Sequence, residues 1–223
     1  MSKSSGMKIS NIFLLILKGL KVISYKGLTI QVINSEITMC DVLIQENKGR
    51  IMGAIVLWKS KVTFLGHTVF ARNYGYDCPG VLYARSSTLI FQGNVEFENN
   101  TGYDGGALGL YEGSQIVIGR HTHLKFIGNH AKHFGGAIYV ENTNYLALSD
   151  LHNILCFYQL LDPLSTSMNP RVVLENNTAN YAGSALYGGW IDICQMEGVY
   201  TTNHDFNRFV TNCIKPSPCM SVH

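Results

Sequence analysis

The sequence feature that most constrains the fold is a motif that recurs five times along the chain. Three copies are strong: FENNTGYDGGAL at 97–108, FIGNHAKHFGGAI at 126–138 and LENNTANYAGSAL at 174–186. Two weaker copies precede them, IQENKGRIMGAI at 44–55 and FARNYGYDCPGVL at 70–82. Each copy has an apolar residue, an Asn three positions later, and a small residue six or seven positions after the Asn. Self-similarity of this kind indicates a repeat fold.

The spacing of the copies predicts the architecture. The small residue falls at Gly53, Gly80, Gly106, Gly136 and Ser184, in steps of 27, 26, 30 and 48 residues. Between these points lie short alternating runs such as LIF, VEF and AIYV, bounded by Gly, Asn and Asp, so helical repeats are set aside. The sequence therefore predicts an all-β solenoid, a single-stranded parallel β-helix with three short strands per coil and about five to six coils.

One unit shows where the strands are expected. Its predicted strands are TLIF (88–91), VEF (95–97) and ALGLY (107–111), and LTIQV (28–32) is predicted to be equivalent to the first of them. Between the first and second strands, a turn that needs positive φ or close backbone approach favours glycine. The glycines at this place are Gly66, Gly93 and Gly119.

Alternation predicts which side chains face the core. Val95 and Phe97 are expected to point inward, with Phe126 of the next coil stacked on Phe97. Glu96 and Lys125 then lie outward on adjacent coils as an opposite-charge pair. In the third strand, alternation predicts an outer tyrosine column made of Tyr83, Tyr139 and Tyr187.

The recurring Asn lies where the chain must turn sharply after the second strand. Asn tolerates the left-handed backbone region, and its amide can bond its own backbone or the Asn of the coils above and below. We therefore predict a structural ladder made of Asn47, Asn73, Asn100, Asn129 and Asn177. The small residues after it are expected to permit the next corner and not to bind phosphate, because no strand-to-helix context surrounds them. These corner glycines are Gly53, Gly80, Gly105, Gly106, Gly135, Gly136 and Gly183.

Composition argues against nucleic acid as a partner. Only 14% of the 223 residues are charged, and the formal net charge is +2. The strongest basic grouping, Lys18 and Lys21, is a pair, whereas a nucleic-acid surface needs several aligned cations. No motif for a cofactor stands out, so none is predicted.

We predict one elongated solenoid over 28–190. In the preceding segment, 1–27, the apolar run Ile12–Leu17 is short for a signal-peptide core and far short of a membrane span. This segment is therefore a capping first coil, a chain start without its leader, or a poor signal peptide. No other segment of the sequence is apolar enough to span a bilayer. Residues 191–223 lose the repeat and are predicted to be a cap or the start of a next module.

The step of 48 residues contains an insertion near 146–170. Its middle, Leu151 to Leu161, is predicted to form a short amphipathic helix, with Asp150 as its N-cap and Pro163 as its stop. Such an insertion either covers exposed core or carries a binding loop, and both interpretations stay open.

The cysteines lack the CxxC spacing of a zinc site. In an extracellular setting they would form disulfides, and we favour a pair between Cys194 and either Cys213 or Cys219 in a terminal cap. The other cysteines are Cys40, Cys78 and Cys156. Two N-x-[ST] sequons recur at one phase of the repeat, so Asn99 and Asn176 are candidate glycosylation acceptors; the alternative is chance within an Asn-rich motif.

The pattern F-x-x-N followed by GGA[IL] resembles the polymorphic outer-membrane protein repeat of bacterial autotransporter adhesins, which in looser form occurs in large extracellular animal proteins. The resemblance is clearest at 97–108 and 126–138, whereas Leu174 replaces Phe and Ser184 replaces Gly in the last copy. It implies a right-handed parallel β-helix of the pectin lyase-like type, exposed at a cell surface and acting in adhesion or as a stalk; general chirality agrees with this hand. It implies no catalytic residues. The segment 185–194 and the cysteines after it are more similar to the animal-type proteins.

An enzyme is the first alternative, because parallel β-helices also build pectate lyases and polygalacturonases. Such enzymes need paired carboxylates, or an Arg or Lys base beside a calcium site, in one groove. The available acids form no recurring column, so we expect no enzyme activity. They are Asp77, Asp104, Glu96 and Glu112.

Two further sites need to be weighed. His121 and His123 alternate on an outward strand face and can share a metal, but incidental histidines on a solvated strand are the simpler interpretation, so no metal site is predicted. Tyrosines at outer positions can form a platform for sugar rings, although outer aromatic columns more often only stack on one another. The platform would consist of Tyr103, Tyr111, Tyr139, Tyr187 and Trp190.

The sequence thus predicts a non-enzymatic module of a larger protein, extracellular or on a cell surface, with a structural or adhesive role. Its expected partners are other extracellular proteins or glycans. A carbohydrate-binding or carbohydrate-active β-helix is the alternative function.

Overall fold

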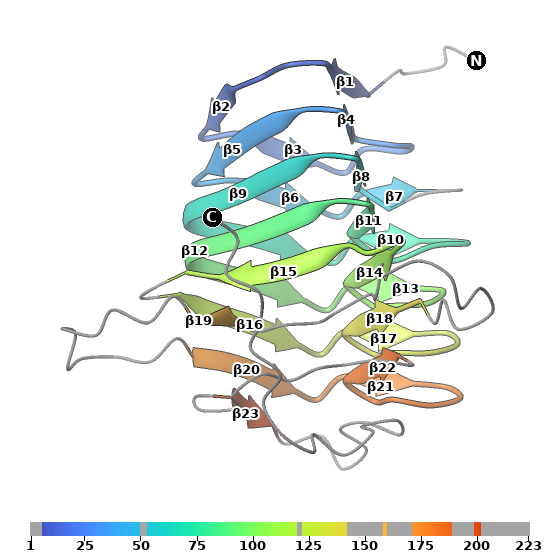
Figure 1. Ribbon diagram of the computed structural model, residues 1–223. Coiled ribbons are helices and arrows are strands. Elements are labelled where there is room, and N and C mark those ends of the chain that lie inside the picture. Colours follow the sequence, from blue (N-terminus) through green and yellow to red (C-terminus); the bar gives the residue numbers. More distant parts are fainter. Residues whose placement is uncertain are drawn as a thin grey trace, which may run out of the picture.

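A computed structural model describes residues 6–49, 53–119, 122–141, 158–159, 171–188 and 199–201. Strands are the only regular elements among these residues, and they wind into a solenoid whose coils stack along one axis (Figure 1). Neighbouring strands of each sheet come from successive coils and pair in parallel, as Leu82 does with Leu108. The predicted all-β parallel solenoid is confirmed.

The coils build three sheets. Sheet A has seven strands, in the order β1 (Met7–Ser10), β4 (Ile30–Ile33), β8 (Ile55–Trp58), β11 (Leu82–Arg85), β14 (Leu108–Tyr111), β18 (Ile138–Val140) and β22 (Leu186–Gly188). Sheet B has eleven, with the main path β2 (Leu15–Lys18), β5 (Glu36–Cys40), β9 (Lys61–Ala71), β12 (Thr88–Glu98), β16 (His123–Ile127), β20 (Arg171–Glu175) and β23 (Val199–Thr201). The strands of sheet B beside this path are β3 (Lys21–Ile23), β6 (Leu43–Gln45), β15 (Gln115–Ile118) and β19 (Tyr158–Gln159).

Sheet C is made of five very short strands directly after the recurring Asn. They are β7 (Lys48–Gly49), β10 (Tyr74–Gly75), β13 (Thr101–Gly102), β17 (His130–Ala131) and β21 (Thr178–Ala179). Figure 1 shows them one above another on the side of the solenoid opposite the bend of β9 and β12. Strands of two residues carry no periodicity, and for that reason the sequence did not predict them.

The predicted first and second strands are fused in two coils. β9 runs without interruption through Gly66, and β12 through Gly93, with the two glycines paired in register. Both have positive φ, 65° and 128°, so glycine bends each strand without breaking the hydrogen-bonded ladder. At Gly119 the constraint is space, because an added Cβ would lie 2.6 Å from Cγ of Gln92.

The prediction for residues 28–32 was wrong. β4, which covers most of that segment, pairs with β1 and β8 in sheet A and is therefore a third-type strand. The first-type strand of this coil is β5, where Ile37 and Met39 point into the core. Both strand types are short apolar runs with period two, so alternation alone does not distinguish them.

The core lies between sheets A and B and is built from columns of identical or similar side chains. Phe97 stacks between Phe70 and Phe126, with ring centroids 4.7 and 4.8 Å apart, and all three are fully buried. A second stack joins Phe64 and Phe91 at 5.3 Å. Offset ring stacks of this kind add stability beyond the burial of apolar area. The predicted inward positions are confirmed.

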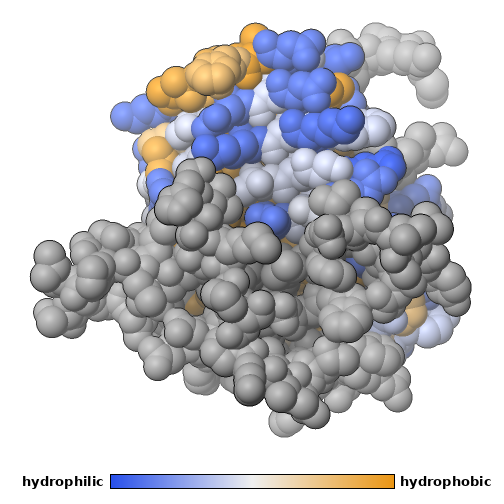
Figure 2. Space-filling view, viewed as in Figure 1, coloured by the Kyte–Doolittle hydropathy of each residue, from blue (hydrophilic) through white to orange (hydrophobic). Residues whose placement is uncertain are grey.

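The first coil has an exposed apolar end. Its strands β1, β2 and β3 each pair on one side only with strands of the second coil. Phe13, Leu14 and Ile16 are 92%, 60% and 63% exposed. Figure 2 shows apolar atoms at this end of the solenoid, beside hydrophilic side chains of the next coils. Among the described residues, no helix is long and apolar enough to cross a membrane.

The insertion and the C-terminal segment lie mostly outside the described residues. Within the predicted helix, Tyr158 and Gln159 pair as a strand with Val117 and Ile118, so the helix prediction is wrong at these two residues. Its N-cap and stop, Asp150 and Pro163, lie outside the described part. In the C-terminal segment, β23 continues sheet B beside β20.

Candidate functional site

The recurring Asn residues are buried and linked from coil to coil. Asn100 Nδ2 donates to Asn129 Oδ1 at 2.9 Å and to the carbonyl of Phe70 at 2.9 Å. Its Oδ1 accepts the backbone N–H and the Nδ2 of Asn73, at 2.9 and 3.0 Å. The same pattern joins Asn47 to Asn73 and Asn129 to Asn177. Each amide therefore satisfies its own polar atoms and those of the adjacent coils.

The left-handed residue at this corner is the one before the ladder Asn. Asn99 and Asn176 have φ of 51° and 52°, and Glu46 and Arg72 occupy the same place in earlier coils at 57° and 52°. The ladder Asn itself does not have left-handed backbone. The argument that Asn recurs at this place because it tolerates the left-handed region was therefore wrong. The two sequon residues lie at this corner with exposed side chains.

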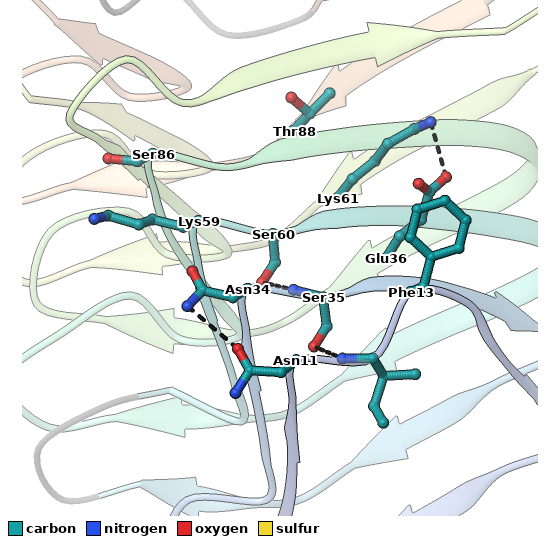
Figure 3. Close-up of a pocket in the computed structure, with 11 residues that line it drawn as sticks. Asn11, Phe13, Asn34, Ser35, Glu36, Lys59, Ser60, Lys61, Ser86 and Thr88 are labelled. Carbon is teal, nitrogen blue, oxygen red and sulfur yellow. Dashed lines mark hydrogen bonds and ion pairs between the residues drawn. The ribbon is translucent and has the colours of Figure 1, made fainter.

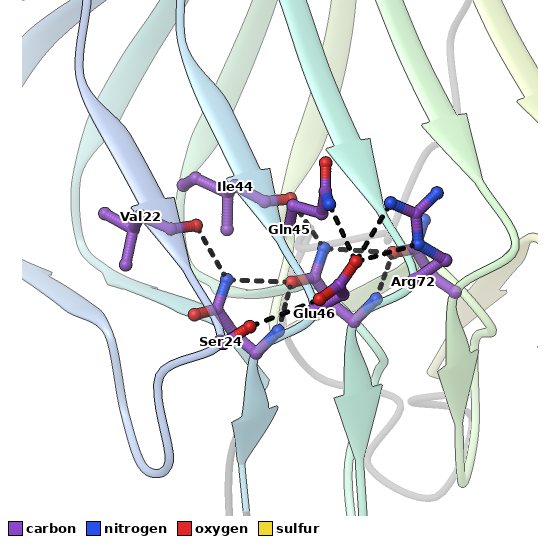
Figure 4. A network of polar contacts seen from close by, with 9 residues as sticks. Val22, Ser24, Ile44, Gln45, Glu46 and Arg72 are labelled. Carbon is purple, nitrogen blue, oxygen red and sulfur yellow. Dashed lines mark hydrogen bonds and ion pairs between the residues drawn. The ribbon is translucent and has the colours of Figure 1, made fainter.

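A polar network ties this corner together at the N-terminal end. Glu46 Oε1 accepts from Gln45 Nε2 at 2.7 Å and from Arg72 Nη2 at 3.0 Å, and Ser24 Oγ donates to Oε2 at 3.2 Å (Figure 4). These hydrogen bonds, the one from Gln45 first, lower the pKa of the Glu46 carboxyl. Three consecutive coils are joined by one carboxylate.

The corner glycines serve two different needs. Gly105, Gly135 and Gly183 have φ of 76°, 67° and 69°, which favours glycine directly. The following residue needs space: a Cβ on Gly106 would lie 2.0 Å from the carbonyl oxygen of Gly136. Gly53, Gly80 and Gly136 face the same restriction from the next coil.

A second polar ladder follows sheet A, and sequence reasoning missed it. The Oγ of Ser60 accepts the backbone N–H of Ser35 at 3.2 Å and donates to the carbonyl of Trp58 at 2.8 Å. Ser87 and Ser114 repeat the arrangement in the next two coils. The signal was the spacing of these serines, 25, 27 and 27 residues, close to the period of the Asn motif.

Beside the serine ladder runs an open groove of about 570 Å³ (Figure 3). Its corner residues are Asn11, Asn34 and Lys59, all with left-handed backbone. Its one carboxylate, Glu36, is paired with Lys61 at 2.8 Å. The described lining of the groove thus lacks the pair of carboxylates that glycoside hydrolysis requires.

The loops after sheet C fold back over the outer face of sheet A, and aromatic rings fill the space between them. Tyr83 stacks on Tyr111 at 4.5 Å, Tyr139 on Tyr187 at 5.9 Å, and Phe134 from a loop stacks on Tyr187 at 4.3 Å. Burial raises the pKa of Tyr139 to about 12. The outer tyrosines are therefore half-buried and packed against one another, and of the proposed sugar platform only Tyr103 is exposed; Trp190 lies outside the described residues.

Three other tyrosines stay exposed on those loops. Tyr76, Tyr103 and Tyr181 have 57%, 42% and 68% of their surface accessible. The His133 ring lies between two of them, with its centroid 5.2 Å from that of Tyr103 and 4.7 Å from that of Tyr181. Lys132 Nζ lies 4.5 Å from the Tyr76 ring. We call these five residues the tyrosine row.

His133 is held in place from both sides. Its Nδ1 lies 3.1 Å from Asp104 Oδ1, which also accepts the backbone N–H of Phe134 at 3.2 Å. Burial raises the pKa of the Asp104 carboxyl, and the contact with His133 acts in the opposite direction. The imidazole also packs against the Phe134 ring at 3.8 Å. The row therefore has a rigid centre.

Three of the four candidate catalytic acids each contact a different basic side chain. Glu96 pairs with Lys125 at 2.7 Å, as predicted, Glu112 pairs with Arg85, and Asp104 contacts His133. Within the described ranges no group of three His, Cys, Asp or Glu is arranged to hold a metal ion. His121 lies outside these ranges, and His123 is a half-buried residue of β16.

Two cysteines lie in the described part of the chain, and both are free thiols: Cys40, which is half-buried, and Cys78, which is buried. Burial raises the pKa of Cys78 to about 12. Cys156, Cys194, Cys213 and Cys219 lie outside the described residues, so the favoured disulfide stays a prediction.

Comparison with known families yields one match. The model of the Chlamydia polymorphic membrane protein repeat matches residues 123–141. The chain carries a polymorphic membrane protein repeat. The matched segment starts at β16, includes Asn129, Gly135 and Gly136, and ends just after β18, so it covers most of one coil of the solenoid but not its first-type strand, β15. Neither the curated proteins nor the solved structures provide a match.

Proposed function

We propose that this chain is a non-enzymatic structural module, exposed at a cell surface, that contributes an adhesive face to a larger protein. The solenoid and the polymorphic membrane protein repeat fit a structural β-helix module. The observation that carries the adhesive role is the tyrosine row, because exposed Tyr rings are among the side chains that protein surfaces use for recognition.

The extracellular part of the proposal has two supports. The matching family is one of membrane proteins by its description. The sequon residues Asn99 and Asn176 are exposed at one corner of the solenoid, where an attached glycan would point away from the core. The non-enzymatic part is supported by the carboxylates, because Glu96, Glu112 and Asp104 each serve a separate contact between coils.

Adhesion of coated beads to cultured epithelial cells tests the proposal. The variant Tyr76→Ser/Tyr103→Ser/Tyr181→Ser removes the exposed rings and leaves in place the stacked outer tyrosines Tyr83, Tyr111, Tyr139 and Tyr187. We expect it to lower the number of bound beads about tenfold or more, since central aromatic residues dominate binding energies.

The matched control is Phe13→Ser/Leu14→Ser, which removes exposed apolar side chains from the first coil. It is expected to adhere like the parent chain. Circular dichroism and thermal melting establish that both variants are folded. Equal adhesion of the triple variant and the parent would overturn the adhesive role of this face.

A further inference from the structure

We propose that the first coil of the solenoid docks on a membrane surface rich in anionic phospholipid. This inference concerns a different surface and a different partner from the tyrosine row, and it goes beyond the adhesive role proposed above. It is carried by apolar side chains, lysines and open strand edges that gather at one end of the solenoid.

Apolar side chains surround this end. Phe13 and Leu14 lie exposed in the corner between β1 and β2. Ile16 on β2 and Ile23 on β3 are exposed as well. Inside this rim, further apolar side chains pack against the core but stay partly accessible, because no described coil covers them; they are Leu15, Leu17, Leu20 and Val22. Exposed apolar surface concentrated in one place marks an interaction site.

Every charged residue of the described first coil, residues 6–27, is a lysine, and all four are exposed. They are Lys8, Lys18, Lys21 and Lys26. The first acidic residue of the whole chain is Glu36 in the second coil, and Lys61 already pairs with it at 2.8 Å. Among the described residues no ion pair involves the four lysines, although Lys18 attracts the Asp41 carboxylate of the second coil. This end therefore carries a surplus of cations.

Cations and apolar groups stand side by side on the outer faces of two strands. Ile16 and Lys18 are the exposed residues of β2, and those of β3 are Lys21 and Ile23. Residues two positions apart lie on the same side of a strand, so each strand presents one apolar side chain beside one ammonium group. Binding to a lipid surface grows with the apolar area placed among the headgroups and with the attraction of lysines to anionic lipids. The pattern suits an anionic membrane on both counts.

Charge and placement argue against two other occupants. A second copy docked by the same end would bring lysines together, and like charges opposed at an interface disfavour binding. A protein interface takes most of its binding energy from side chains near its centre. Here the apolar side chains are spread around the coil, from the corner at Phe13 to the outer faces of β2 and β3. A fluid lipid surface accommodates each of them separately.

Open strand edges limit how deep this end can go. Within the described part of the chain, β1, β2 and β3 each pair on one side only, with β4, β5 and β6. Backbone groups along the other edge need water or headgroups as partners, and hydrocarbon offers none. We therefore expect the first coil to rest in the headgroup region, with side chains such as Phe13 reaching the acyl chains.

Docking by this end determines how the tyrosine row is presented. The row comes from loops after sheet C, whose strands β10 to β21 belong to the third to sixth coils (Figure 1). Coils stack at about 4.8 Å, so the row lies about 10 to 25 Å from the first coil along the axis. A solenoid standing on its first coil holds the row clear of the headgroups. Anionic phospholipid is concentrated in the cytoplasmic leaflet of cells, so this docking does not contribute to the bead adhesion described above.

Flotation of lipid vesicles in a density gradient tests the inference. One set of vesicles is phosphatidylcholine alone, and the other holds equal parts of phosphatidylcholine and phosphatidylglycerol. We expect the full chain to float with the second set only, and to be released as the salt concentration rises, because ions screen the lysines. Phe13→Ser/Leu14→Ser should lower the partition coefficient about tenfold or more. Lys18→Gln/Lys21→Gln should lower it to a similar extent.

Matched controls make the same chemical changes in other coils. Tyr103→Ser/Tyr181→Ser removes two exposed rings, and Lys59→Gln/Lys132→Gln removes two positive charges. Both control variants should float like the parent chain. Circular dichroism and thermal melting establish that all variants are folded. Flotation with neither set of vesicles, equal flotation with both sets, or equal losses in the control variants overturns the inference.

Tryptophan fluorescence gives a readout that does not depend on loss of binding. Phe13→Trp places an indole on the first coil, and Tyr103→Trp places one in the tyrosine row. We expect phosphatidylglycerol vesicles to shift the emission of the first variant to shorter wavelengths and to leave that of the second like the parent's. A shift in both variants or in neither overturns the inference. So does sedimentation without lipid that shows a dimer dissociated by Phe13→Ser/Leu14→Ser, in a chain that does not float with vesicles.

Discussion

At the scale of single residues, this fold is specified by polar side chains that bond along the axis. Asn100 is fully buried and joins three coils through its amide. The hydroxyl of Ser60 joins two coils at the serine corner, because it accepts from Ser35 of the preceding coil and donates to Trp58 of its own. Buried polar groups are costly unless they are hydrogen-bonded, so a ladder position tolerates few other residues.

The replacement Asn100→Ala tests this dependence. It leaves the backbone N–H of Asn73 and the carbonyl of Phe70 buried without the partner they have now. Each such group costs about 1–3 kcal/mol, so we expect the free energy of unfolding to fall by about 2–6 kcal/mol in urea denaturation. The control is Asn94→Ala, at an exposed position of β12, with an expected change within about 0.5 kcal/mol. Similar decreases in the free energy of unfolding for the two variants would contradict a stabilising role of the asparagine ladder.

The sequence predicted the asparagine ladder but not the serine ladder, and the difference is physical. The Asn recurs beside a conspicuous glycine corner, whereas Ser35, Ser60 and Ser87 follow left-handed residues of different types, Asn34, Lys59 and Ser86. Nothing local marks those serines as buried. Only the stacking of coils places each serine hydroxyl beside the backbone N–H of the equivalent serine in the preceding coil.

At the scale of elements, the corners decide how strands are distributed among the sheets. Alternation marked residues 28–32, most of β4, as a short apolar strand but did not tell which sheet this strand joins. The position of a strand relative to a corner does tell which sheet it joins, because sheet A strands lie before the serine corner. β4 precedes Ser35 in the same way as β8 precedes Ser60. Correct assignment from sequence therefore needs both ladders.

The glycine corner can be tested with a matched pair of substitutions. Gly106→Ala places a Cβ 2.0 Å from a backbone oxygen of the next coil, and backbone has little freedom to move. Gly19→Ala adds a Cβ with no neighbour within 4 Å, at φ of 65°. We expect the free energy of unfolding to fall by about 3 kcal/mol or more for Gly106→Ala. For Gly19→Ala we expect it to fall by about 1 kcal/mol, because only left-handed strain acts there. Thermal melting that ranks them in the reverse order would refute close packing of the corners.

At the scale of the whole molecule, the stacked coils turn scattered residues into continuous surfaces. Tyr103 and His133 lie at different positions of their motif copies, because the Asn and the corner glycine are separated by six residues in one and seven in the other. The spacing in the sequence therefore relates Tyr76 to Tyr103 and His133 to Tyr181, but it does not relate one pair to the other. The solenoid itself was predictable because its motif recurs five times, at steps close to 27 residues over most of the chain, whereas the tyrosine row depends on loop paths that vary between coils.

Labelling of intact producing cells with a membrane-impermeant, lysine-reactive reagent tests directly whether this module is exposed at a cell surface, as we propose. Lys59 and Lys61 are exposed side chains on one edge of the solenoid and are the sites to quantify by peptide mapping. We expect equal labelling of both lysines before and after lysis, and loss of the signal when intact cells are treated with external protease. Labelling that occurs only after lysis would contradict this proposal.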